Sequence, residues 1–171
     1  VVDDQGYVLG LLTTEMLYMF NDSDDAFAEI NTKRILPHVL IVGGAGYIGS
    51  ILTEMLLKKG WRVRVLDKLI YDQDSLSGFV NTDKFSFVQG DVCDLHTQVE
   101  VIKGIDSVVF LAEIVGDQSC KYLPQTAFKT NYLAINSMAA LCAHTNINRF
   151  VYTSSCSVYG ASSNPKAILN E

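Results

Sequence analysis

The stretch His38-Val39-Leu40-Ile41-Val42-Gly43-Gly44-Ala45-Gly46-Tyr47-Ile48-Gly49-Ser50 decides the fold of this chain. An apolar run ends in a glycine-rich turn, and a helical pattern begins directly after the turn. Gly43 can take backbone angles that a side chain forbids, Gly46 leaves room for a phosphate, and Gly49 lets the helix pack closely on the strand. The N-terminus of that helix offers unpaired N–H groups to an anion. Glycine-rich turns are common, so the surrounding residues must decide the interpretation.

Length and composition indicate one globular domain with an extension. The chain has 171 residues, of which 49% are hydrophobic and 19% charged. The formal net charge of -6 argues against a nucleic-acid surface built on general basicity. No apolar run approaches the roughly 18 residues of a membrane span, and no signal segment begins the chain. We therefore expect no nucleic-acid partner, no membrane insertion and a cytoplasmic location.

The cysteines and histidines form no metal-binding pattern. The four cysteines are widely spaced, without a Cys-x-x-Cys pair, so we expect reduced thiols rather than disulfides or metal ligands. The three histidines share no ligand spacing with them, so we expect no metal. The chain begins at Val1 without a methionine and stops at Glu171 without a terminating pattern. This suggests a piece of a longer protein, although an expression boundary or processing would look the same.

Residues 1–35 are expected to form an N-terminal extension. Asp4-Gln5-Gly6 is a turn between two apolar runs, which predicts a short β-hairpin. Thr13 or Thr14 can then cap a helix that runs to about Phe20.

Residues 1–18 weakly resemble the closing half of a CBS motif, a regulatory module that binds adenine nucleotides. Met16 stands where that family has an acidic residue for ribose, and an apolar side chain cannot accept a hydroxyl hydrogen bond. The alternative is an ordinary hairpin and helix that pack on the main domain.

Residues 36–171 alternate strand and helix patterns, which predicts an α/β fold. We expect strands near 38–42, 61–67, 84–89, 106–112 and 149–154. The expected helices cover about 47–59, 95–103 and 124–145. The first helix should bury the face made of Ile48, Ile51, Leu52, Met55 and Leu56. The last helix should bury the stripe made of Phe128, Ile135, Met138 and Cys142. Right-handed crossovers then give a Rossmann-like doubly wound parallel sheet of about five strands.

Acidic residues stand where two of these strands end, at the edge where such sheets bind ligands. Asp67 ends the second strand, where a carboxylate can hold the adenosine ribose hydroxyls and repel a 2′-phosphate, favouring NAD over NADP. Lys68 complicates that preference because a lysine can pair with a phosphate. Asp91 follows the third strand, where the adenine amino group would lie, and Val92 could cover the adenine ring. Alternatively, Asp67 and Asp91 only cap a helix or shape a turn.

Two polar residues lie near or on the buried stripe of the last helix and need partners there. Thr130 and Asn131 can hydrogen-bond neighbouring strand ends, and Thr130 can also reach the cofactor.

Taken together, these motifs resemble the extended branch of the short-chain dehydrogenase/reductase superfamily. More narrowly, the chain is similar to the NAD-dependent epimerase/dehydratase family, which acts on nucleotide sugars. The motifs are the turn 43–49, Asp67, Gly90-Asp91-Val92, Phe110-Leu111-Ala112-Glu113 and Tyr152-Thr153-Ser154-Ser155-Cys156-Ser157-Val158-Tyr159-Gly160.

The resemblance implies roles for individual residues. Tyr47 and Ile48 would meet the pyrophosphate, beside Gly43, Gly46 and Gly49. Leu111, Ala112 and Glu113 would line the middle of NAD, and Thr130 would lie beside it. Ser155 would hydrogen-bond the reacting hydroxyl of the substrate; the alternative is a polar strand end that satisfies its own backbone.

Two departures from the family pattern bear on function. Glu113 stands where the family has alanine, and NAD phosphates would repel its carboxylate unless it turns to solvent or a partner. The family's catalytic Tyr-x-x-x-Lys pair would fall beyond Glu171, and Tyr159 is no substitute because Ser163 stands where the lysine would be required. We therefore expect the chain to lack the acid/base pair and to be inactive by itself.

Three hypotheses follow from these patterns. In the first, the chain is the NAD-binding part of a nucleotide-sugar epimerase or dehydratase, in which a homodimer is possible. In the second, it is a non-catalytic nucleotide-binding or regulatory module. In the third, the chain binds nothing stably, because five strands alone leave apolar surface uncovered and invite oligomerisation or aggregation.

Overall fold

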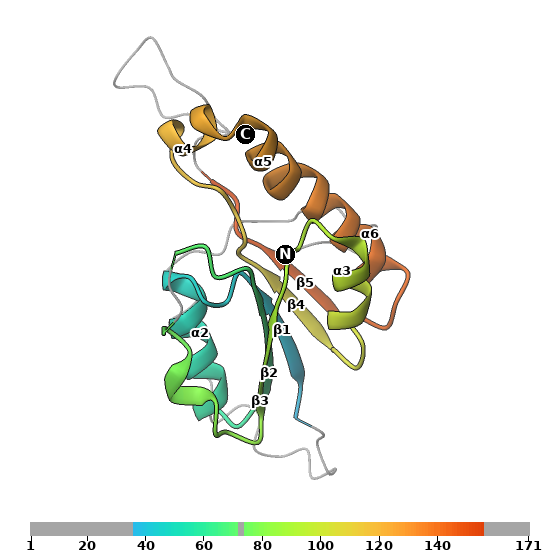
Figure 1. Cartoon of the computed structure of the whole chain (residues 1–171). Coiled ribbons are helices and arrows are strands. Elements are labelled where there is room, and N and C mark those ends of the chain that lie inside the picture. The colour runs from blue at the N-terminus through green and yellow to red at the C-terminus, as the bar shows by residue number, and fades with distance from the viewer. Residues whose placement is uncertain (1–35, 72–73, 156–171) are drawn as a thin grey trace, which may run out of the picture.

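The computed structural model describes residues 36–71 and 74–155 (Figure 1). Five strands form one sheet: β1 (His38–Val42), β2 (Arg62–Asp67), β3 (Phe85–Gln89), β4 (Ser107–Phe110) and β5 (Arg149–Tyr152). All pairings are parallel, in the order β3-β2-β1-β4-β5. This confirms the predicted α/β Rossmann-like sheet. The hairpin, the CBS-like residues 1–18 and Cys156 lie outside the described residues.

Helices cover both faces of the sheet, as a doubly wound fold requires. In Figure 1, α2 lies on one side, with α3 and α6 on the other. The helical segments are α2 (Tyr47–Lys58), the short 3-10 turn η1 (Ser77–Phe79), α3 (Leu95–Val101), α4 (Asp117–Tyr122), α5 (Pro124–Phe128), the π-helical segment η2 (Lys129–Ala134) and α6 (Ile135–Ala143). Within the described ranges, no helix is both long and apolar enough to cross a membrane.

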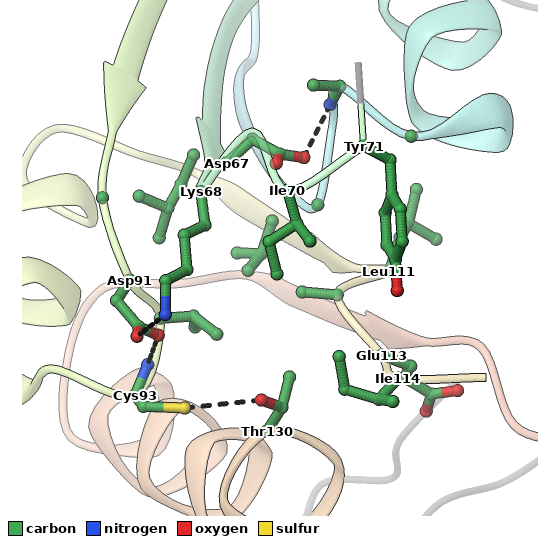
Figure 2. A pocket seen from close by; sticks show the side chains of 18 of the residues that line it. Asp67, Lys68, Ile70, Tyr71, Asp91, Cys93, Leu111, Glu113, Ile114 and Thr130 are labelled. Atoms are coloured by element: carbon green, nitrogen blue, oxygen red, sulfur yellow. Dashed lines mark hydrogen bonds and ion pairs between the residues drawn. The ribbon is translucent and has the colours of Figure 1, made fainter. Parts of the chain in front are cut away.

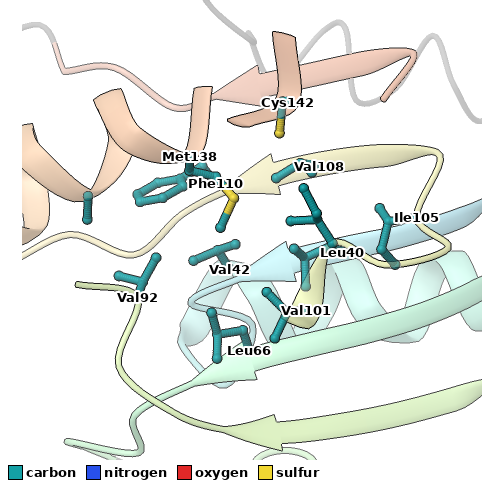
Figure 3. Packing of buried hydrophobic residues seen from close by; sticks show 12 residues of the cluster. Leu40, Val42, Leu66, Val92, Val101, Ile105, Val108, Phe110, Met138 and Cys142 are labelled. Atoms are coloured by element: carbon teal, nitrogen blue, oxygen red, sulfur yellow. The ribbon is translucent and has the colours of Figure 1, made fainter. Parts of the chain in front are cut away.

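Strand β1 is the centre of the core because all five of its residues are buried. Successive side chains of a strand point to opposite faces, so β1 supplies both sides of the sheet. Leu40 and Val42 join the cluster beneath α3 and α6, which includes Phe110 and Met138 (Figure 3). Val39 and Ile41 belong to the second cluster, on the side of α2.

The buried face of α2 differs from the predicted one. Ile48 and Ile51 are 57% and 46% exposed, whereas Gly49 and Thr53 are the buried residues of the helix. A β-carbon on Gly49 would lie 2.5 Å from the Cα of Gly44. This close approach turns the smallest side chains of α2 toward the strand. Apolar spacing alone therefore predicted the wrong orientation for the two isoleucines.

The segment after β4 also differs from the prediction. The helix expected over 124–145 is divided by the π-helical segment η2, and α4 precedes it where no helix was predicted. A π-helix has more residues per turn than an α-helix, so the buried stripe changes phase. Ala127 and Ala134 are buried, while Phe128 is 55% exposed and stacks on Tyr132 at 5.2 Å between ring centroids. Placing Phe128 in the stripe was therefore wrong, whereas Met138 and Cys142 are buried as predicted.

Candidate functional site: a pocket at the carboxyl ends of the strands

A pocket of about 380 Å³ lies where β1, β2 and β4 end (Figure 2). Ten of the predicted site residues line it: Gly43, Gly46, Asp67, Lys68, Asp91, Val92, Leu111, Ala112, Glu113 and Thr130. Four do not line it: Tyr47, Ile48, Gly49 and Ser155. The carboxyl edge of a parallel sheet gathers residues that are far apart in the sequence, and the predicted residues meet there for that reason.

The glycine-rich turn has the backbone geometry predicted for it. Gly43 has φ +80°, and a β-carbon there would lie 2.7 Å from the backbone nitrogen of Ala112. The Gly43 N–H donates to the carbonyl of Leu66 at 2.8 Å. Gly44 also requires glycine, because its β-carbon would lie 2.6 Å from Val65 Cγ1.

The N-terminus of α2 faces open space that an anion can use. Gly46 is the N-cap, with no side-chain cap and no acidic residue in the first turn. A β-carbon on Gly46 would meet only the carbonyl oxygen of Gly43, at 3.3 Å. Tyr47 is 85% exposed, so the groups that α2 directs to this space are its first backbone N–H groups. A diphosphate fits this arrangement of donors and helix dipole.

The Asp67 carboxylate ties the end of β2 to the glycine-rich turn. Its Oδ2 accepts from the Ala45 N–H at 2.9 Å, and its Oδ1 accepts from the Leu69 N–H at 2.8 Å. Leu69 has φ +57°, a conformation that non-glycine residues rarely adopt, and the bond to Asp67 helps to hold it. Each carboxylate oxygen retains a lone pair that can accept from a ribose hydroxyl.

Lys68 is directed at Asp91 rather than at the space beside Asp67. Its Nζ lies 2.7 Å from Asp91 Oδ2 (Figure 2). Asp91 Oδ1 also accepts from the Cys93 N–H at 2.9 Å. Burial alone would raise the pKa of Asp91, but the hydrogen bonds from Lys68 and Cys93 outweigh it and lower that pKa. The lysine that complicated the cofactor preference is therefore engaged with a carboxylate.

The π-helical segment η2 brings two predicted polar residues to the pocket wall. Thr130 Oγ1 lies 3.5 Å from Cys93 Sγ, and burial is the main cause that raises the pKa of the Cys93 thiol. The Asn131 side chain accepts from the Ile114 N–H and donates to the Ile114 carbonyl, each at 2.8 Å. These bonds confirm that Asn131 satisfies backbone groups just beyond a strand end.

Glu113 has turned to a partner. Its Oε1 accepts from the Tyr152 hydroxyl at 2.6 Å. Burial, followed by the hydrogen bond and charge of Glu113, raises the pKa of Tyr152 to about 12. Ser155 follows β5 at the same edge of the sheet and is exposed.

Several lining residues were not predicted: Ile70, Tyr71, Ile114, Thr126 and Lys129. Ile70 and Tyr71 come shortly after Asp67, and both are largely exposed. Their position just past a strand end was the signal that could have identified them. Thr126 and Lys129 could not be assigned to the pocket from the sequence, because the change of helical phase at η2 decides which side chains face the pocket. Among the described residues, no group of three or more histidine, cysteine or acidic side chains is placed to hold a metal ion.

The sheet order, the glycine-rich turn and the acidic residue at the end of β2 define a dinucleotide-binding domain of the Rossmann type. The chain belongs to the NAD dependent epimerase/dehydratase family, whose model matches residues 39–170.

Three relatives illustrate this similarity. The chain is 32% identical over 132 residues to a dTDP-glucose 4,6-dehydratase from Streptomyces niveus, covering 72% of this chain and 39% of that protein. It also matches the epimerase Mth375 of Methanothermobacter thermautotrophicus, with 32% identity, a TM-score of 0.69 and coverage of 78% of this chain and 40% of the other. The UDP-glucose 4-epimerase of Brucella ovis in complex with NAD matches at 27% identity and a TM-score of 0.65, over 75% of this chain and 39% of that one. The chain thus spans about two fifths of the length of these proteins.

Proposed function

We propose that this chain forms the NAD-binding part of an enzyme that epimerises or dehydrates a nucleotide sugar. The observation that carries the proposal is the bond between Asp67 and the Ala45 N–H. It places the expected ribose-binding carboxylate directly beside the turn and helix N-terminus that suit a diphosphate.

The described residues can be assigned to the parts of NAD. The first N–H groups of α2, including those of Tyr47 and Ile48, would bind the diphosphate. Asp67 would accept from the adenosine ribose hydroxyls, while Asp91 and Val92 would lie at adenine. Leu111, Ala112 and Glu113 would line the middle of the cofactor, and Thr130 would lie beside it. NAD, when bound, supplies the acceptor for a hydride from a sugar carbon.

Proton transfer is the part of the reaction that this chain does not supply. Ser155 would orient the reacting hydroxyl, but the sequence contains no Tyr-x-x-x-Lys pair. A positioned acid or base contributes roughly 100- to 10,000-fold to a rate. We therefore propose that the chain binds NAD and turns over no substrate alone.

Three finer assignments belong to the same proposal. The substrate would be a nucleotide sugar, because two of the relatives named above are a dTDP-glucose 4,6-dehydratase and a UDP-glucose 4-epimerase. The chain would work in the cytoplasm, and the intact enzyme would form a homodimer.

A coupled assay tests the catalytic part of the proposal. The chain is incubated with NAD and either dTDP-glucose or UDP-glucose, and the keto or epimerised product is measured. The dTDP-glucose 4,6-dehydratase of Streptomyces niveus serves as the positive comparison. We expect product from that enzyme and none from the chain. Robust turnover by the chain itself would contradict the assignment of the missing acid/base.

A regulatory nucleotide-binding module is the second candidate function. The CBS-like residues 1–18 and the intact glycine-rich turn of the dinucleotide-binding type favour it. Such a module would bind AMP or ATP in preference to NAD, and Asp67→Ala would leave that binding unchanged.

A further inference from the structure

Glu113 brings a carboxylate to the pocket at a place where a charge matters for the proposed cofactor. It follows β4 and lines the pocket on the side opposite Lys68 and Asp91 (Figure 2). A diphosphate bound at the N-terminus of α2 would lie in the same pocket, because both Gly46 and Glu113 line it. A carboxylate that swung inward would repel it.

Tyr152 is placed to prevent that movement. Its backbone is fixed opposite Phe110 in the parallel pairing of β4 and β5. From there its hydroxyl donates to Glu113 Oε1 at 2.6 Å, a short hydrogen bond to a charged acceptor. A tyrosine hydroxyl is protonated at neutral pH, and the raised pKa of Tyr152 extends the range in which it can donate to higher pH.

The other two carboxylates of the pocket are held differently. Asp67 accepts from two backbone N–H groups, and Asp91 pairs with the ammonium of Lys68. A phenol, by contrast, directs a carboxylate without neutralising it. The position of the Glu113 side chain therefore decides how strongly its charge acts on a bound anion.

We propose that Tyr152 is a positioning residue that holds the Glu113 carboxylate aside and so allows the diphosphate of a dinucleotide to enter the pocket. This inference rests on the proposed NAD site. If the hydroxyl is removed, the carboxylate can approach the diphosphate by a few ångström. At an effective dielectric constant near 20, that approach weakens binding by roughly three- to tenfold.

Calorimetric titration of the full chain tests the proposal with four proteins: wild type, Tyr152→Phe, Glu113→Gln and the double variant. NAD is the probe, and adenosine, which has no phosphate, is the reference ligand. Tyr122→Phe, on exposed α4 and outside the pocket lining, controls for loss of a tyrosine hydroxyl. Glu54→Gln on α2 controls for loss of a negative charge.

We expect Tyr152→Phe to bind NAD three- to tenfold more weakly, while its affinity for adenosine stays within about twofold of wild type. The double variant should regain wild-type NAD affinity, because the charge that Tyr152 restrains is gone. Glu113→Gln alone should bind NAD as tightly as wild type or more tightly. Both control variants should match wild type.

Three results would overturn the inference. They are unchanged NAD binding by Tyr152→Phe, a double variant that stays weak, or weaker binding by Glu113→Gln, which would mean that the carboxylate itself contacts the cofactor. The comparison of Glu113→Gln with wild type still tests the inference if Tyr152→Phe does not fold. Wild type that binds no NAD would instead contradict the proposed function, so the two failures are distinguishable.

Discussion

Gly49 lies directly against Gly44, so that a β-carbon on Gly49 would come within 2.5 Å of the Gly44 Cα and 2.6 Å of the Gly43 carbonyl oxygen. These neighbours are backbone atoms, which cannot move aside as a flexible side chain can. This close contact holds the N-terminus of α2 against the glycine-rich turn, where the proposed site for the diphosphate lies.

Gly49→Ala should therefore lower the free energy of unfolding by about 1–3 kcal/mol, the usual range for overpacking. Urea denaturation measures this change. Gly78→Ala is the matched control, because a β-carbon there meets nothing within 4 Å. It should change stability by no more than about 0.5 kcal/mol. Equal losses for the two variants would refute the role given to the Gly49 contact.

Asn131→Leu should destabilise the loop that follows β4. The Asn131 side chain pairs with both backbone polar groups of Ile114, a buried residue. In Asn131→Leu the Ile114 N–H loses this partner, while the carbonyl keeps the weak S–H donor of Cys120 at 3.3 Å. The unpaired N–H should cost about 1–3 kcal/mol in the free energy of unfolding. Asn136→Ala is the comparison, since that exposed side chain donates only to the Tyr132 carbonyl within the helix. Chemical denaturation that ranks Asn136→Ala as the more damaging change would contradict this account.

Asp91→Asn should shift cofactor choice toward NADP. In wild type, Lys68 pairs with Asp91, and Asp67 opposes a 2′-phosphate, so NAD is preferred. Neutralising Asp91 releases the Lys68 ammonium, which can then pair with that phosphate. Titrations with NAD and NADP should show a rise in the NADP to NAD affinity ratio. In Asp91→Asn/Lys68→Met the ratio should return toward wild type, and a ratio that stays high would exclude Lys68 as the cause.

His38 should make stability depend on pH near neutrality. It is buried at the start of β1, and its Nδ1 lies 2.9 Å from the Gly104 carbonyl oxygen. Burial first, then the charges of Arg62 and Arg64, lowers the pKa of His38 from 6.5, whereas the nearby Asp106 acts in the opposite direction. The unfolded chain consequently binds more protons than the folded chain as pH falls through 6.5. The free energy of unfolding should be fully retained above that pH and should decrease below it.

Denaturation between about pH 7.5 and pH 5.5 measures this effect, because carboxylates stay largely ionised over that range. His38→Asn should flatten the decrease. His144→Gln, at an exposed histidine, should preserve it. A decrease that persists unchanged in His38→Asn would assign the pH dependence to other groups.

Local patterns were sufficient to predict most of the sheet and much of the pocket. Strand β1 could be recognised because a fully buried strand is a continuous apolar run, and Asp67 because it follows such a run. Parallel strands end at a common edge, so residues at those ends could be assembled into one site without knowing any contact.

The remaining features depend on contacts that sequence patterns do not encode. The rotation of α2 follows from the close approach of Gly49 to Gly44, which overrides the apolar spacing of Ile48 and Ile51. The buried stripe of the last helix changes phase at the wider turn of η2. Phe128, at the end of the preceding α5, is therefore exposed.

The pairing of polar side chains also could not be predicted from the sequence. Lys68 meets Asp91 across 23 positions, and Glu113 meets Tyr152 across 39. The sequence shows the charge of each residue but not the partner that its rotamer reaches. The sequence predicted that a carboxylate at position 113 needs a partner or solvent. Only the sheet order, in which β5 lies beside β4, identifies Tyr152 as that partner.

Calorimetric titration of the chain with NAD, compared between wild type and Asp67→Ala, tests the central claim most directly. We predict saturable binding of one NAD per chain, weakened in Asp67→Ala by about 10- to 100-fold, as expected for lost hydrogen bonds to a charged group. AMP and ATP should bind more weakly than NAD. Absence of NAD binding, or tighter binding of AMP or ATP that Asp67→Ala leaves unchanged, would contradict the assignment of this pocket to NAD.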